Sequence, residues 1–192
     1  MTKGRLEAFS DGVIAIIITI MVLEIKVPLG AKFEDIEHLV PEFISYTMSF
    51  VFVLIYWNNH HHMFQAVEKV NGKVLLANGF LLFWLSLTPF VTGWMGKNNF
   101  AQLPVLLYGI VAAVSGFAWN ILGNQLIILH GTDSYIAKAI GNNQKGLISL
   151  GLYIAGVIVS FFNPLISCGL YALVSIIWLI PDKRIEKTIG VD

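Results

Sequence analysis

Charge is what this sequence lacks most. Only 12% of its 192 residues are Asp, Glu, Lys or Arg, whereas 56% are hydrophobic. A soluble globular domain carries about 25% charged residues, so a water-soluble fold of this size would have too few polar side chains to cover its surface. The low charge and the mean hydropathy of +0.74 therefore predict an integral membrane protein that has the lipid bilayer as its partner.

Other absences exclude whole classes of function. Basic and acidic residues cancel to a net charge of +0, which excludes a nucleic-acid partner, because phosphate binding needs a surplus of Lys and Arg. Cys168 is the only cysteine, so an internal disulfide framework and a multi-cysteine metal site are both excluded. The sequence contains no H-E-x-x-H motif, the helical zinc signature of metalloproteases. We expect no enzyme activity, no bound metal and no cofactor.

Six apolar segments have roughly the length of a membrane helix. They are residues 7–27, 43–64, 74–95, 103–129, 147–163 and 165–180. Pro89 lacks a backbone N–H and predicts a kink in the third segment, and Asn163-Pro164 predicts a tight turn between the last two. The expected fold is a single all-α domain over residues 1–192 with six transmembrane helices.

Lysine and arginine are distributed unevenly between the two sets of connections. Three lie in the odd-numbered connections, namely Lys26, Lys32 and Lys97. Nine lie at the termini and in the even-numbered connections, namely Lys3, Arg5, Lys69, Lys73, Lys138, Lys145, Lys183, Arg184 and Lys187. Because positive residues stay on the cytoplasmic side, both termini are expected to be cytoplasmic, which six spans also require.

The first span is the one that carries charged residues, and Asp11 lies four residues into it. A carboxylate near a helix N-terminus is favoured by the backbone dipole, but this does not explain the polar residues expected at the same depth: Arg5, Ser10, Trp57, His60, His61 and Asn78. A histidine, Trp57 or Asn78 can donate a hydrogen bond to Asp11. Such a network would lock the first span to the second and third. At the other end of the span, Glu24 is expected to pair with a lysine such as Lys26 or Lys32, and a ring of four Glu24 carboxylates that attracts cations is the alternative.

The segment Arg5-Leu6-Glu7-Ala8-Phe9-Ser10-Asp11 resembles the R-x-x-x-F-S-D signature of the transmembrane protein 175 family. These are the endosomal and lysosomal potassium channels and their prokaryotic homologues. The resemblance implies a homotetramer in a prokaryotic plasma membrane, with four copies of the first helix around a central pore and the signature residues Arg5, Phe9, Ser10 and Asp11 holding that helix. It matches Ile16 to the narrow ring, and Thr19, Ile20 and Leu23 to pore-facing positions.

Helical geometry agrees with this assignment. At 100° per residue, Gly12, Ile16, Ile20 and Leu23 fall within about 60° of one another, whereas Asp11 lies roughly 140° away. One face of the first span can therefore meet ions while the other packs. Ile16 side chains are expected to form a dry ring, and Thr19 hydroxyls would contact potassium transiently. The sequence has no T-V-G-Y-G segment, which excludes a carbonyl filter, so we expect monovalent cation conduction with modest potassium over sodium selectivity.

Three other functions compete with this interpretation. A proton-coupled transporter or proton conductor would use Asp11 with the histidines at 60–62, because histidine titrates near neutral pH. A metalloenzyme would need those histidines to share one metal, yet neighbouring helical residues point in different directions. A structural protein would use Asn120, Asn124 and Gln125 only to hold helices together.

Overall fold

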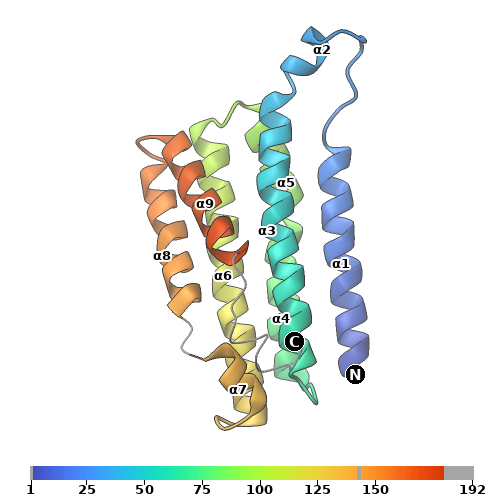
Figure 1. Cartoon of the computed structure of the whole chain (residues 1–192), viewed down its shortest axis with the longest axis vertical. Coiled ribbons are helices and arrows are strands. Elements are labelled where there is room, and N and C mark those ends of the chain that lie inside the picture. The colour runs from blue at the N-terminus through green and yellow to red at the C-terminus, as the bar shows by residue number, and fades with distance from the viewer. Residues whose placement is uncertain (1, 142–143, 180–192) are drawn as a thin grey trace.

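The computed structural model describes residues 2–141 and 144–179, and within them the chain forms helices and no strands (Figure 1). The helices in chain order are α1 (Lys3–Leu23), α2 (Glu34–Glu37), α3 (Val40–Gln65), α4 (Gly72–Ser86), α5 (Thr88–Lys97), α6 (Gln102–His130), α7 (Tyr135–Ile140), α8 (Gln144–Val159) and α9 (Pro164–Leu179).

Within the described ranges, four apolar segments are long enough to cross a membrane. They are α1, α3, α4 together with α5, and α6. The described parts of the two remaining segments, α8 and α9, are apolar and have 16 residues each, or about 24 Å at 1.5 Å per residue; α8 begins and α9 ends at the limit of a described range. Of the six expected spans, four are thus long enough, within the described residues, to cross a membrane.

A turn over residues 160–163 separates α8 from α9. α8 ends at Val159, before the predicted end at 163, and α9 begins at Pro164. Proline suits the first turn of a helix because its missing N–H would have no helical partner there. The Asn163 side chain accepts hydrogen bonds from the backbone N–H groups of Leu165 (3.0 Å) and Ile166 (3.3 Å), which caps α9.

The third span is interrupted next to Pro89, where the sequence predicts a kink. α4 ends at Ser86 and α5 begins at Thr88, with Pro89 in its first turn and Leu87 between the two helices. Pro89 cannot donate the hydrogen bond that would continue the α4 ladder. α4 and α5 are therefore two helices within one crossing.

The first helix lies four residues earlier than expected at both ends, at Lys3–Leu23 instead of 7–27. Pro28 disfavours helical geometry in the residue before it, and the polar stretch from Glu24 to Lys26 leaves the helix. Asp11 is consequently eight residues, or about 12 Å, from the start of α1, which is further along the helix than the sequence suggested.

α6 contacts α4, α5, α8 and α9, whereas α3 packs against α1, α5 and α9. α1 stands at one edge of the bundle, against α3, α4 and α5, and the α8–α9 pair stands at the opposite edge (Figure 1). Tyr171 of α9 fills the space beside Gly109 of α6 and Gly156 of α8, where an added Cβ would overlap its ring or hydroxyl. α8 and α9 are therefore held against α6 by close packing.

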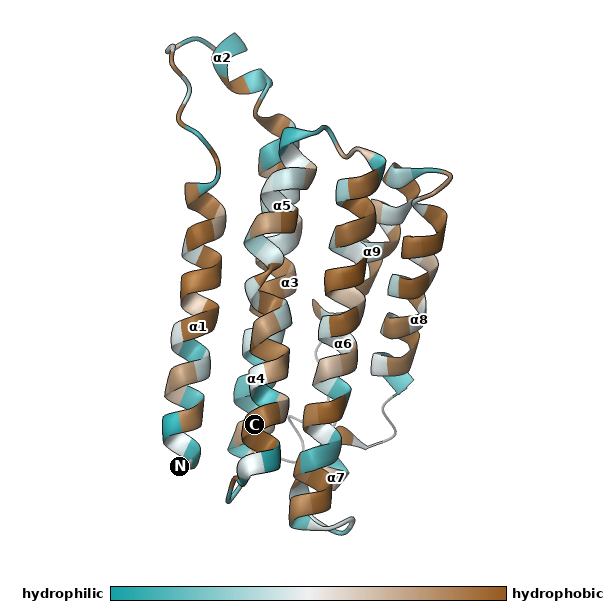
Figure 2. Ribbon diagram, turned by 180° about the vertical axis from the view of Figure 1, so that it is seen from behind, coloured by the Kyte–Doolittle hydropathy of each residue, from teal (hydrophilic) through white to brown (hydrophobic). Residues whose placement is uncertain are grey.

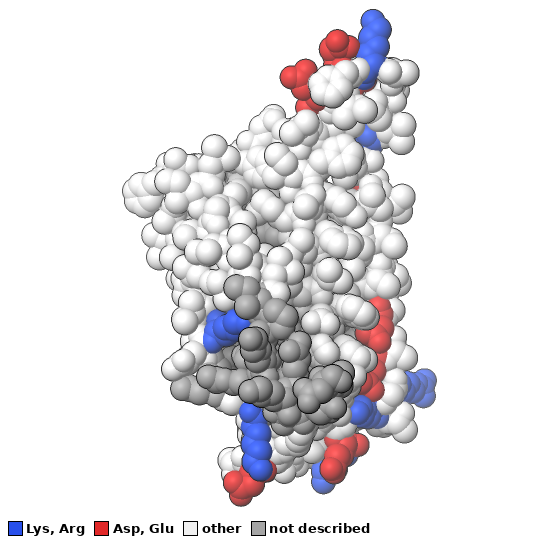
Figure 3. Space-filling view, viewed as in Figure 1, with Lys and Arg blue, Asp and Glu red and all other residues white. Residues whose placement is uncertain are grey.

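Charge and hydropathy follow the long axis of the bundle. The helices are predominantly hydrophobic along their middle parts, and the lower third of α1 carries hydrophilic positions (Figure 2). On the face drawn in Figure 3, charged side chains gather toward the two ends and leave a broad uncharged band between them. This distribution fits a bilayer, because hydrocarbon accepts apolar side chains and excludes unpaired charge.

Candidate pore helix

α1 has one buried face and one open face. The buried side chains are spaced three or four residues apart and pack against the rest of the chain: Leu6, Ser10, Ile14, Ile17 and Met21. Gly12, Ile16, Thr19, Ile20 and Leu23 lie on the opposite side and are all exposed. The helix is thus supported from one side only, and its other side is free to meet lipid, water or a second copy.

Between Gly12 and Leu23, the open face is apolar apart from Thr19. The exposed fraction is 57% for Ile16, 42% for Ile20 and 79% for Leu23. The Thr19 hydroxyl donates to the carbonyl oxygen of Ile16 at 2.9 Å. Because that bond uses the hydroxyl hydrogen, the oxygen lone pairs of Thr19 remain available to a cation.

Three buried side chains join α1, α3 and α4. The Asn78 amide donates to the Ser10 hydroxyl at 2.9 Å, and the Asn78 carbonyl oxygen lies 2.9 Å from Nε2 of His60. The Ser10 hydroxyl donates in turn to the Leu6 carbonyl at 2.9 Å. Since a carbonyl oxygen only accepts, His60 carries its proton on Nε2. All three side chains are at most 1% exposed, so each depends on these partners.

A second contact holds the same end of α1. The indole Nε1 of Trp57 donates to the carboxylate of half-buried Asp11 at 3.0 Å. His61 stacks on the Trp57 ring with 6.3 Å between centroids, and its Nε2 lies 2.9 Å from the Gln65 amide nitrogen. Of the hydrogen-bond donors predicted for Asp11, it is Trp57 that contacts it in the structure.

The consecutive histidines have separate surroundings because adjacent helical positions point about 100° apart. His60 faces α4, His61 stays with its own helix, and Nδ1 of His62 is buried with no hydrogen-bond partner in the described ranges. In the described part of the chain, no three His, Cys, Asp or Glu side chains form a group able to hold a metal ion.

The signature segment is divided between the two faces of α1. Ser10 and Asp11 point into the bundle and are hydrogen-bonded, whereas Arg5 and Phe9 are exposed, Phe9 to 60%. Among the described residues, the guanidinium of Arg5 has no ion-pair or hydrogen-bond partner. The structure therefore brings Ser10, Asp11, Trp57, His60 and Asn78 together and leaves Arg5, Phe9 and His61 outside the inter-helix contacts.

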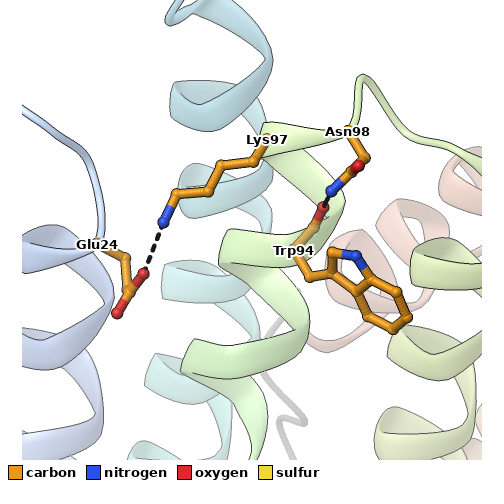
Figure 4. Close-up of polar contacts among 4 residues, drawn as sticks. All are labelled: Glu24, Trp94, Lys97 and Asn98. Atoms are coloured by element: carbon orange, nitrogen blue, oxygen red, sulfur yellow. Dashed lines mark hydrogen bonds and ion pairs between the residues drawn. The ribbon is translucent and has the colours of Figure 1, made fainter.

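At the other end of α1, the partner of Glu24 is Lys97, not Lys26 or Lys32. The Lys97 ammonium lies 2.8 Å from the Glu24 carboxylate and reaches it from the end of α5 (Figure 4). Sequence proximity misled this prediction, because Lys26 follows Glu24 into a loop while Lys97 lies on a helix packed against α1. The signal that identifies Lys97 is depth: both residues end spans on the same side of the membrane.

This chain is similar to a known protein family and to a named bacterial protein. The family model described as endosomal/lysosomal potassium channel TMEM175 matches residues 5–89, which hold Arg5–Leu23 of α1 and the residues Ser10, Asp11, Trp57, His60 and Asn78 that join α1 to α3 and α4. A protein named as a potassium channel from Chryseobacterium sp. (strain P1-3) is 56% identical over 189 residues, 98% of each chain.

A solved structure and a vertebrate protein extend these similarities. The crystal structure of a lysosomal potassium-selective channel TMEM175 homolog from Chamaesiphon minutus superposes with a TM-score of 0.79 at 29% sequence identity, covering 93% of this chain and 96% of that one. A Danio rerio protein named endosomal/lysosomal proton channel TMEM175 is 36% identical over 101 residues, which is 46% of this chain and 19% of that protein.

Proposed function

The chain belongs to the TMEM175 family, and from this membership we propose that it is a potassium-permeable cation channel. Its relative with 56% identity is named a potassium channel. The observation that carries the proposal is the open face of α1, where Ile16, Ile20 and Leu23 are exposed while the opposite face is anchored by buried hydrogen bonds. A helix built in this way is suited to line a conduit that other copies complete.

The proposed assembly is a homotetramer with α1 of each copy facing a common axis. A pore lined by one kind of helix needs several copies, and closed cyclic symmetry supplies them. The whole chain would act as one channel domain that crosses the plasma membrane of a bacterium six times. In this arrangement α8 and α9 form two shorter crossings and both termini are cytoplasmic.

The proposed constriction is a ring of Ile16 side chains. A narrow apolar ring closes a pore by excluding water, and a wider one conducts. An ion that passes it loses part of its hydration shell, and the Thr19 oxygens one turn further along would replace some of that water. Potassium sheds water more readily than sodium, which gives a modest preference for potassium. No cofactor takes part in this mechanism.

The direct test is potassium efflux from liposomes that contain the purified protein, with sodium as the competing ion. We expect efflux from the wild type and a larger, less selective efflux from Ile16→Asn, because an amide wets the ring. Ile158→Asn is the matched control, since Ile158 of α8 has the same 57% exposure and lies far from the proposed axis. Equal conductance and selectivity in Ile16→Asn and the wild type would contradict the constriction.

Proton conduction is the second candidate, because vertebrate relatives are named proton channels. Asp11 and the histidines at 60–62 are the titratable groups that would serve it. In this chain Asp11 accepts from Trp57, and His60 is bonded to Asn78, so a relay through them would have to break both contacts. A pH-sensitive dye inside the same liposomes separates the two functions: acidification that Asp11→Asn abolishes, without potassium efflux, would favour the proton conductor.

A further inference from the structure

α1 is attached to the third span at two points, and these points lie on different helices. Near its beginning, Ser10 accepts a hydrogen bond from Asn78 of α4. At its end, Glu24 is paired with Lys97 of α5. The break at Leu87 separates α4 from α5, so the two attachments belong to two separate helices.

The end of α5 is held firmly against α3. An added Cβ on Gly96 would lie 2.7 Å from Cα of Glu42, which shows how closely α5 meets the α3 backbone. Thr92 donates to the Ser49 hydroxyl of α3 at 2.6 Å, and both side chains are buried. The direction of α5 is thus set by its contacts with α3.

Lys97 is the last residue of α5, and the chain reverses immediately after it. The Asn98 side chain donates to the Trp94 carbonyl at 2.8 Å (Figure 4), and the backbone N–H of Phe100 donates to the Met95 carbonyl at 3.0 Å. Asn99 and Phe100 have φ values of 50° and 57°, in the left-handed region that non-glycine residues seldom occupy. These contacts fix the point from which the Lys97 side chain extends.

The end of α1 has little other support. Met21 is its last buried residue, and Leu23 is 79% exposed. The Glu24 carboxylate lies beside Gly93, where an added Cβ would be 3.4 Å from Oε2. Beyond Met21, the ion pair with Lys97 is therefore the polar contact that joins α1 to its neighbour.

We infer that Lys97 is a positioning residue for conduction: through Glu24 it holds the outer end of α1 against α5 and so sets the distance of Leu23 from the pore axis. This inference rests on the proposed function. α5 lies on the packed side of α1, so a repulsive pair at these positions pushes the end of α1 toward its open face. In the tetramer that direction narrows the outer pore.

The test compares Lys97→Glu, Glu24→Lys and the double exchange in the liposome potassium assay. Both single variants place like charges together, and we expect each to reduce efflux by about threefold or more. An effect of mouth charge alone predicts opposite changes, because one variant makes the mouth more negative and the other more positive. The double exchange restores the pair and should return efflux to near the wild-type level.

Lys26→Glu is the matched control, since it makes the same charge change at the same end of α1, and no hydrogen bond or ion pair of Lys26 with another described residue is recorded. Its efflux should stay near the wild type, and tetramer yield should be unchanged in all four variants, because exposed ion pairs add little stability. Single variants with wild-type efflux, opposite effects of the two singles, or a double exchange as impaired as the singles would each overturn the inference. A wild type without efflux would instead contradict the proposed function itself.

Discussion

The two ends of α1 are held by different kinds of contact. Near the N-terminus, Ser10, His60 and Asn78 are buried and Asn78 is hydrogen-bonded to both Ser10 and His60, while Asp11 accepts from Trp57. At the other end, the Lys97 and Glu24 side chains are 36% and 48% exposed. Buried polar groups are costly to leave unpaired, whereas exposed ion pairs contribute little. One end therefore fixes the helix in the fold, and the other adjusts its position.

The largest effect on stability is expected at the buried end, from Asn78→Ala. The variant leaves the His60 Nε2–H without an acceptor and the Ser10 hydroxyl without a donor, and an unpaired buried group costs about 1–3 kcal/mol. We expect a clear fall in the melting temperature of the purified protein, or loss of its assembly. Asn58→Ala is the control, because Asn58 is exposed on the same helix as His60. Equal melting temperatures in the two variants would remove the anchoring role of the network.

A smaller loss is expected from Trp57→Phe, measured in the same melting experiment. The variant removes the N–H that Asp11 accepts, a hydrogen bond to a charged group worth roughly 1.5–3 kcal/mol when intact. Asp11 is only half-buried, so water replaces part of what is lost. A melting temperature below that of Asn78→Ala would reverse the proposed order of the two contacts.

The smallest effect on stability is expected from Lys97→Gln, at the exposed end. The amide keeps most of the side-chain length and removes the charge, and an exposed pair contributes roughly 0–1 kcal/mol. The melting temperature should change little, while potassium efflux should fall toward the values of the charge-reversed variants. A large fall in melting temperature would show that this end, too, is a structural anchor.

Much of the fold was predictable, because it depends on hydropathy and proline. The apolar segments predicted the four long spans, and Pro89 predicted the position of the break in the third span. The ends of α1 and the boundary between α8 and α9 were not predictable to the residue. The end of α1 depends on Pro28, and the boundary between α8 and α9 depends on the Asn163 cap and on Pro164.

The sequence predicted which residues belong to the site better than it predicted which of them contact one another. Helical spacing placed Ile16, Ile20 and Leu23 on one face, and the structure leaves that face open. Which of His60, His61 and His62 meets Asn78 depends on the rotation of α3, and which lysine meets Glu24 depends on the packing of α5 against α1. Both are tertiary facts that a single sequence does not contain.

The central claim is that the open face of α1 lines the ion route, and cysteine modification tests it most directly. Cys168 is the only native cysteine and is buried, so the background reaction is low. Leu23→Cys and Leu103→Cys place a thiol at exposed leucines at the end of α1 and the start of α6.

The two variants are compared with a charged, membrane-impermeant thiol reagent during potassium efflux from liposomes. If α1 lines the pore, the reagent blocks efflux through Leu23→Cys and leaves efflux through Leu103→Cys unchanged. Unblocked efflux through Leu23→Cys after its thiol has reacted, or equal block of both variants, would contradict the claim.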